Sequence, residues 1–209
     1  MYPPLPLPAQ LFLLAVNPNR ERLTRRSELG YVLRAGALAE LLLRGDLVDE
    51  DGRAASVRAS RPADPVLGPI FQQVADGRRR RWSHWVYKGA RRTTGVVQDQ
   101  LAAQRYITVE SYRILGIFPA RRIRFVDPLL YPQMLQSIEV TLGGPGRVDN
   151  RDAALVALVA AGELDTVLPR AKRRAHRTRI DELREQAGPL PKALAKVLRD
   201  VRSAAANAG

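Results

Sequence analysis

Residues 29–47, LGYVLRAGALAELLLRGDL, contain the clearest helical pattern in the sequence. Ser27 precedes this stretch as a candidate helix N-cap, and Gly45, near its end, is a candidate helix-stop residue after Arg44. A helix that is apolar on all sides is normally buried. We therefore expect this segment to form the central helix of a helical domain, because apolar residues cover nearly every face of it: Leu29, Val32, Leu33, Ala37, Leu38, Leu41, Leu42 and Leu43.

Arg34 is the lone charge in the apolar middle of this predicted helix. The positions three and four residues away hold Gly30, Tyr31, Ala37 and Leu38, which cannot neutralise a guanidinium. An unpaired guanidinium costs several kcal/mol if it is buried without a partner. Arg34 must therefore either pair with a distant carboxylate or open onto a pocket that accepts an anion, and we favour the pocket.

Outward from this helix, the sequence predicts a mainly α fold with short β-hairpins in a single domain, 1–209. The proline-rich start, residues 1–8, is expected to be extended, and the tail 203–209 is expected to fray. Asp51 and Gly52 form a hairpin-turn signal, and residues 112–126 predict a second hairpin. Further helices are expected at 9–16, 66–77, 94–105, 129–142, 153–161, 170–184 and from about 190 onward.

Composition limits the class of protein. A chain of 209 residues with 45% hydrophobic and 26% charged residues is typical of one globular domain. No apolar run reaches the roughly 18 residues that a membrane-spanning helix needs, and the N-terminus lacks the basic region of a secretory signal, so we expect a cytoplasmic protein. The absence of cysteine excludes disulfides, thiolate catalysis and cysteine-ligated metal sites.

The charge balance predicts an anionic partner. The chain has 34 Lys and Arg against 21 Asp and Glu, a net charge of +13, and a pI near 11.0. Arginine binds phosphate oxygens as a planar fork. However, an excess of Arg over Lys is also typical of proteins from high-GC bacteria such as actinobacteria, so only the net charge carries the argument.

The segment 78–92, RRRRWSHWVYKGARR, combines seven basic residues and three aromatic residues with no acid. Tryptophan and tyrosine favour the headgroup level of a bilayer, where each nearby cation adds about 1 kcal/mol. We therefore expect Trp82 and Trp85 to contact a membrane or a second subunit. Two alternatives stay open: the segment could bind nucleic acid, or both tryptophans could belong to the core.

Catalytic signals are lacking, so we expect a protein that is not an enzyme and needs no cofactor or metal. His84 and His176 lie in strongly basic segments without an adjacent carboxylate to orient a general base. The sequence contains no phosphate-binding loop, nucleophile elbow or zinc-protease motif. An enzyme with scattered catalytic residues is the least favoured hypothesis.

The segment 29–47 resembles the signature helix of the Golgi phosphoprotein 3 family, which carries a leucine-rich "AELALRG" segment. Other matching segments occur in the family's order: LFLLAV at 11–16, the Asp-Pro pair at 64–65, ILGIFP at 114–119 and AALVALVAAGEL at 153–164. The resemblance therefore extends over nearly the whole chain.

This resemblance implies apolar central helices surrounded by amphipathic helices, with one protruding hairpin. It also implies a non-catalytic adaptor that binds phosphatidylinositol 4-phosphate on the Golgi of eukaryotes, or an acidic phospholipid on the inner face of a bacterial cell membrane. The family pocket uses a tryptophan, an arginine of the signature helix and two later arginines. Those positions hold Arg25, Arg34, Arg91 and Thr94 in this chain, and we expect Arg25, Arg34, Arg91 and Arg92 to bind the headgroup.

The resemblance also assigns membrane contact and self-association to the hairpin at 112–126. Its expected apex is Phe118-Pro119, and the cations Arg121, Arg122 and Arg124 follow. The partners expected are an anionic membrane lipid, a protein cargo and a second copy of the chain. The alternative from another class is a nucleic-acid-binding regulator, because a helix followed by a basic hairpin at 94–126 resembles a winged helix.

Overall fold

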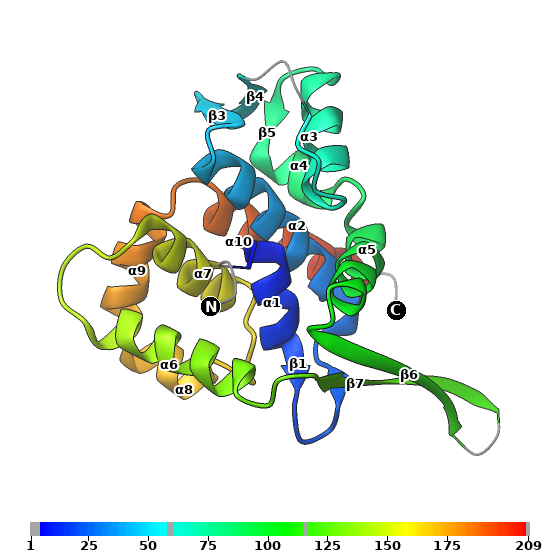
Figure 1. The fold of residues 1–209 in the computed structure, drawn as a ribbon. Helices are drawn as coiled ribbons and strands as arrows, with labels where there is room; N and C mark the ends of the chain where they lie inside the picture. The colour runs from blue at the N-terminus through cyan, green and yellow to red at the C-terminus, as the bar shows by residue number, and fades with distance from the viewer. Residues whose placement is uncertain (1–4, 58–60, 115–116, 208–209) are drawn as a thin grey trace.

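The computed structural model describes residues 5–57, 61–114 and 117–207, except for the side chains of residues 113, 114 and 118–120. The chain is 60% helical, and the described part forms ten helices with short antiparallel sheets. The mainly α fold predicted from the sequence is therefore confirmed. Figure 1 shows the helices grouped into one body from which a single long hairpin extends.

The central element is α2 (Arg26–Leu43), as the signature stretch predicted. It packs against α1 (Leu7–Ala15), α5 (Ala90–Ala103), α7 (Asn150–Ala161) and α10 (Leu190–Ala206). Every residue from Leu29 to Leu41 is buried. The predicted N-cap was wrong by two positions, because Arg25 caps the helix with φ at 48° and Ser27 lies in the first turn.

Glu40 is the buried carboxylate of α2, and its hydrogen bonds account for a charged residue within the apolar signature stretch. Its side chain is 0% exposed, and its carboxylate accepts hydrogen bonds from the Leu7 backbone N–H at 3.0 Å, from Arg44 at 2.8 Å and from two nitrogens of Arg151 at 2.7 Å. Burial opposes ionisation of Glu40, but the donors from Arg151, Leu7 and Arg44 outweigh burial and lower its pKa. One carboxylate thus joins α1, α2 and α7.

The expected extended start was partly wrong, because α1 begins at Leu7 and includes Pro8. Proline fits the first helical turn, where its missing N–H would have no intrahelical partner. Residues 1–4 of that prediction lie outside the described part of the chain. All residues of α1 except Gln10 are buried, so the segment is a core helix.

Small strands connect the N-terminal helices. Asp51 and Gly52 have positive φ and form the turn of the predicted first hairpin. The strands are β1 (Val16–Asn17), β2 (Arg22–Leu23), β3 (Leu47–Glu50), β4 (Arg53–Ser56) and β5 (Arg80–Arg81), and α3 (Leu67–Ala75) and α4 (Trp82–Tyr87) follow β4 and β5 respectively.

The long hairpin consists of β6 (Ile107–Ile114) and β7 (Phe118–Phe125), and it protrudes from the helical body (Figure 1). The expected apex at Phe118-Pro119 was wrong, because Phe118 pairs with Ile114 and Pro119 pairs with Arg113 within the ladder. Ile117 belongs to the turn and is 74% exposed. The side chains of Phe118 and Pro119 lie outside the described part of the structure.

The C-terminal half contains α6 (Leu130–Gly143), α7, α8 (Arg170–Ala175), α9 (Arg177–Gln186) and α10. The helix predicted at 170–184 is interrupted at His176, whose φ of −100° and ψ of 25° are not helical. The frayed tail predicted at 203–209 was wrong for residues 203–206, because α10 continues to Ala206. Within the described residues, no helix is long and apolar enough to cross a membrane.

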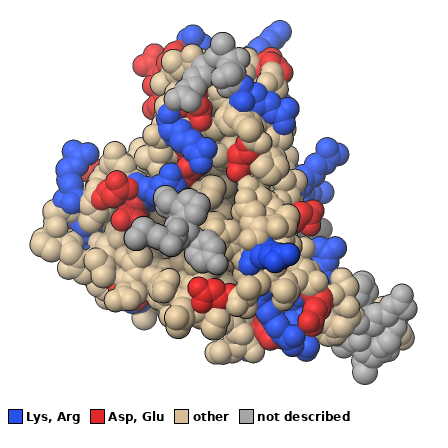
Figure 2. Space-filling view, viewed as in Figure 1, with Lys and Arg blue, Asp and Glu red and all other residues tan. Residues whose placement is uncertain are grey.

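Surface charge is distributed unevenly. On the face drawn in Figure 2, Lys and Arg side chains form separate groups at the top, in the upper middle and at the lower right, and the lower-left surface over α6 is largely uncharged. The net charge of +13 therefore does not by itself identify a contact surface.

Candidate functional site

Arg34 lies in the middle of α2 and is only 2% exposed. Its Nε donates to the Trp85 carbonyl oxygen at 2.6 Å, and its Nη2 donates to Gln73 Oε1 at 2.7 Å. Both acceptors are neutral, and no carboxylate of the described residues forms an ion pair with Arg34. Burial lowers the pKa of Arg34 to about 10, because the charged form loses hydration.

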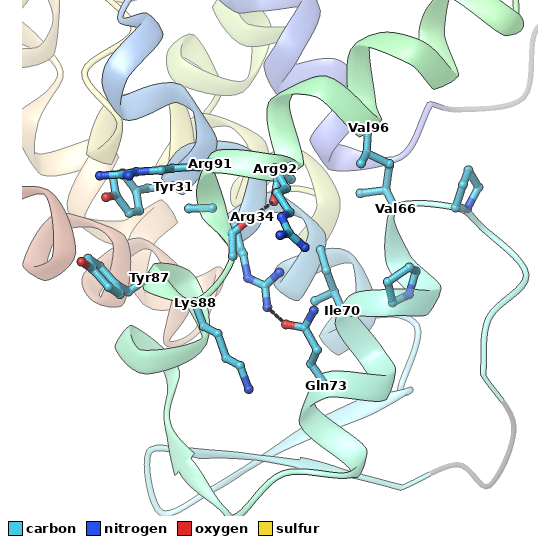
Figure 3. Close-up of a pocket in the computed structure, with 15 residues that line it drawn as sticks. Tyr31, Arg34, Val66, Ile70, Gln73, Tyr87, Lys88, Arg91, Arg92 and Val96 are labelled. Atoms are coloured by element: carbon cyan, nitrogen blue, oxygen red, sulfur yellow. Dashed lines mark hydrogen bonds between the residues drawn. The ribbon is translucent and has the colours of Figure 1, made fainter.

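A cavity of about 520 Å³ opens above this guanidinium, between α2, α3 and the start of α5. Its size is typical of small-molecule sites, which span roughly 300–1,000 Å³. Figure 3 shows the side chains of Tyr31, Ile70 and Val96 around the cavity. Among the described residues that line it, none is acidic and four are cations: Arg34, Lys88, Arg91 and Arg92.

The N-terminus of α5 forms one wall of this cavity. Gly89 caps the helix with φ at +77°, and residues 89–93 all line the cavity. The first backbone N–H groups of a helix have no intrahelical acceptor and carry a partial positive charge, so they attract anions. A Cβ at Gly89 would lie 3.2 Å from Arg34 Nη1, so a side chain there would force Arg34 to shift by a few tenths of an ångström, and the positive φ also favours glycine.

Aromatic side chains form the mouth of the cavity. Tyr31 and Tyr87 stack with ring centroids 5.8 Å apart, and Tyr87 is 61% exposed. Lys88 lies over the ring of Trp85, with Nζ 5.1 Å from the centroid. The mouth therefore combines exposed aromatic surface with cations.

A second hollow of about 860 Å³ lies beside the first, and Arg91 borders both. Its other cations are Arg26 at the start of α2 and Arg121 in β7, and Thr94 supplies a hydroxyl. Sequence reasoning missed Arg26 as a site residue. It also left out Lys88, although Lys88 belongs to the basic segment 78–92 that marked this region.

Arg25 does not belong to the cavity, which corrects its predicted role in headgroup binding. Its side chain donates to the Glu163 carbonyl oxygen at 2.8 Å and to the Glu163 carboxylate at 2.6 Å, and it also pairs with Glu28. Its charge is thus already neutralised within the fold. Arg91 and Arg92 do line the cavity, together with Arg34, as the sequence predicted.

Trp82 and Trp85 are core residues, so their predicted contact with a membrane or a second subunit was wrong. They are 2% and 1% exposed, because α4 packs against α2 and α10. Trp82 Nε1 donates to Asp49 at 2.6 Å, which anchors α4 to β3. The alternative that both tryptophans belong to the core is confirmed.

The hairpin cations differ in how far they are engaged. Arg122 pairs with Glu21 at 2.7 Å, and Arg124 pairs with Glu21 at 2.7 Å and with Glu110 at 3.1 Å. Arg121 is exposed and borders the second hollow. Of the three predicted contact residues, Arg121 is thus the one without an ion pair among the described residues.

Comparison with known proteins identifies the family. No curated protein matches the chain. The model of the family described as Golgi phosphoprotein 3 (GPP34) matches residues 7–201, from the first residue of α1 into α10. The chain therefore belongs to the Golgi phosphoprotein 3 (GPP34) family.

Proposed function

We propose that this protein is a peripheral membrane protein that binds an anionic, phosphatidylinositol 4-phosphate-like headgroup in the cavity at Arg34. Known members of the family bind that lipid at the Golgi and are generally non-catalytic adaptors. The single observation that carries the proposal is the buried Arg34 guanidinium, which has only neutral partners and faces a cavity lined by cations.

A phosphate monoester suits this arrangement. It carries a charge of about −1.5 to −2 near pH 7 and offers three acceptor oxygens. Arg34 would bind it at the floor, while the N–H groups that begin α5 and the side chains of Arg91 and Arg92 would bind it from the rim. The anion would restore to Arg34 the stabilisation that burial has removed.

Membrane attachment is supported by the apolar side chains at the mouth. Tyr87 is 61% exposed and Val96 is 39% exposed, and both border the cavity. Exposed apolar groups beside a phosphate site suit a headgroup that remains in its bilayer. We place the protein on the cytoplasmic face of a membrane, which is the inner face of the cell membrane if the source is bacterial.

Protein contacts complete the proposal. The hairpin at 107–125 would contribute to self-association or membrane contact through Ile117, and an adaptor also implies a protein cargo. Headgroup specificity would come from the residues that line the cavity. Arg25, at the family's tryptophan position, would not contribute, because its side chain is engaged with Glu163. The family's second late arginine is Thr94, which borders the second hollow.

Vesicle co-sedimentation tests this function. Three kinds of vesicle are compared at one salt concentration: phosphatidylcholine alone, the same lipid with phosphatidylglycerol, and the same lipid with phosphatidylinositol 4-phosphate at equal total charge. We expect strong binding to the last, weaker binding to the second and little to the first. Equal binding to all three would refute lipid recognition, and tighter binding to random duplex DNA at that salt would favour the winged-helix alternative.

A further inference from the structure

A third hollow, of about 1070 Å³, lies between α8, α9, α10 and the end of α7. Both α9 and α10 pack against α7, and the hollow runs over α7 between them. Figure 1 shows α8 and α9 on the side of α2 that faces away from α3 and α5. We call this hollow the arginine groove; it shares no lining residue with either of the two hollows near Arg34.

The floor of the arginine groove consists of small and apolar residues. Ala160 and Ala161 end α7, and Ile180 and Leu198 lie beside them, but these four are only 2–6% exposed. The apolar surface open to a partner comes from half-buried Ala195 of α10 and from exposed Ala171 and Ala175 of α8. Alanine side chains permit the close approach of a third helix, as small residues do at helix–helix contacts. The volume of the groove lies at the upper end of the range for small-molecule sites, roughly 300–1,000 Å³.

The rim of the arginine groove is strongly basic. Seven arginines line it against two carboxylates, Glu163 and Asp181. Several of the arginines are neutralised: Arg202 pairs with Glu28 at 2.6 Å, and Arg184 pairs with Asp181 at 2.8 Å. Three others form no ion pair with any described residue: Arg170, Arg174 and Arg199.

The exposed cations occupy both sides of the groove. Arg170 and Arg174 belong to α8, and Arg199 belongs to α10 across the floor. All three side chains are exposed. Because they form no ion pair with any described residue, they are available to an anionic partner. Cations on two rims and an apolar floor between them are complementary to a helix with an apolar stripe flanked by carboxylates.

We propose that the arginine groove is the docking site for an acidic amphipathic helix of a protein partner. This site goes beyond lipid binding, and it does not depend on the lipid cavity. A nucleic acid fits less well, because none of the described lining residues is an aromatic on which bases could stack. A bilayer fits less well, because the floor is concave and only a partner that enters the groove can contact its alanines.

The probe for this proposal is a fluorescein-labelled synthetic peptide of about 18 residues, long enough to be helical, with an Ala/Leu stripe flanked by glutamates. Its control is the same peptide with glutamine in place of every glutamate. We expect the acidic peptide to bind the full-length protein, with anisotropy rising to saturation, and the glutamine peptide to bind at least about tenfold more weakly. Equal binding of the two peptides would overturn the proposal.

A double charge reversal, Arg174→Glu with Arg199→Glu, tests the location. Both side chains are exposed and unpaired among the described residues, so the fold and its circular-dichroism signal should persist. We expect affinity for the acidic peptide to fall at least about tenfold. The matched control, Arg20→Glu with Arg78→Glu, makes the same charge change at two exposed positions outside the groove and should alter affinity by less than about twofold. Equal losses in both variants would mean diffuse electrostatic attraction and overturn the proposal.

Ala195→Phe tests the floor without changing charge. It places a large side chain in the groove and should also weaken the acidic peptide at least about tenfold, whereas unchanged affinity would show that the floor is not used. Duplex DNA and phosphatidylglycerol vesicles are tested as competitors of the peptide. If either binds more tightly than the peptide and is weakened by both groove variants, the groove belongs to that class of partner instead. Arg34→Met should leave peptide binding intact, so failure of the lipid site and failure of the groove are distinguishable.

Discussion

Replacing Arg34 with methionine shows whether Arg34 serves to bind a ligand or to stabilise the fold. The buried guanidinium has its pKa lowered to about 10 from 12.5. At about 1.4 kcal/mol per pH unit, burial of the charge costs the fold about 3 kcal/mol. Methionine removes this cost, but it leaves the acceptors Trp85 O and Gln73 Oε1 without their donor, at about 1–3 kcal/mol each.

These opposing contributions nearly cancel. We expect the free energy of unfolding of Arg34→Met to fall by no more than about 2 kcal/mol, because Gln73 lines the cavity and can turn toward water. Removing an arginine from a buried ion pair would instead cost about 3–5 kcal/mol. Binding of the phosphate headgroup should weaken by about 2–3 kcal/mol, or roughly 30- to 150-fold, because a charge-assisted hydrogen bond at the cavity floor is lost.

The assay pairs urea unfolding, followed by circular dichroism, with titration by a water-soluble short-chain phosphatidylinositol 4-phosphate. Arg44→Met, at the C-cap of the same helix, is the control, since Arg44 pairs with Glu40 and does not line the cavity. It should keep the affinity of the parent protein. Wild-type affinity in Arg34→Met would refute the cavity as the headgroup site, and an unfolding free energy lower by more than about 4 kcal/mol would show that Arg34 is structural.

Three further outcomes are expected. Because its pKa is lowered in the folded state, Glu40 contributes stability that is complete above its usual pKa of 4.5 and is lost as pH falls through the lower folded value. Glu40→Gln should therefore flatten the decline of unfolding free energy between about pH 5 and 3, and an unchanged slope would contradict this. Gly89→Ala should lower the free energy of unfolding by about 1–2 kcal/mol, because φ at this position is positive. It should also weaken headgroup binding in the same titration, because the added Cβ would lie close to Arg34 Nη1. Unaltered binding and stability would argue against the tight turn. Ile117→Ser should reduce vesicle binding or self-association, measured by co-sedimentation and sedimentation velocity, at an unchanged melting temperature, whereas a lower melting temperature would identify a core residue.

The sequence predicted the core well, because periodicity and turn chemistry are local signals. The central helix, the Asp51-Gly52 turn and the apolar helix over 153–161 all depend on neighbouring residues, and all are confirmed. Helix ends were less accurate. The break at His176 divides a uniformly basic stretch in which no proline or glycine marks an interruption.

The site was predicted in part, because pairing between distant residues is invisible in one sequence. Arg34 was singled out because an unpaired charge on an apolar helix is a local signal, and it does line the cavity, while its binding of a headgroup stays a prediction. Arg25 was misassigned because its partner Glu163 lies 138 residues away. Trp82 and Trp85 were misassigned because a basic neighbourhood does not reveal that α4 turns both rings into the core.

Headgroup preference in paired vesicles tests whether the Arg34 cavity binds a phosphate monoester. The parent protein and Arg34→Met are each sedimented with phosphatidylinositol 4-phosphate vesicles and with phosphatidylglycerol vesicles of equal charge. We expect the parent protein to prefer the phosphate monoester and Arg34→Met to bind both vesicles equally, through its remaining surface cations. A preference that persists in Arg34→Met, or that is absent from the parent protein, would contradict headgroup binding in the Arg34 cavity.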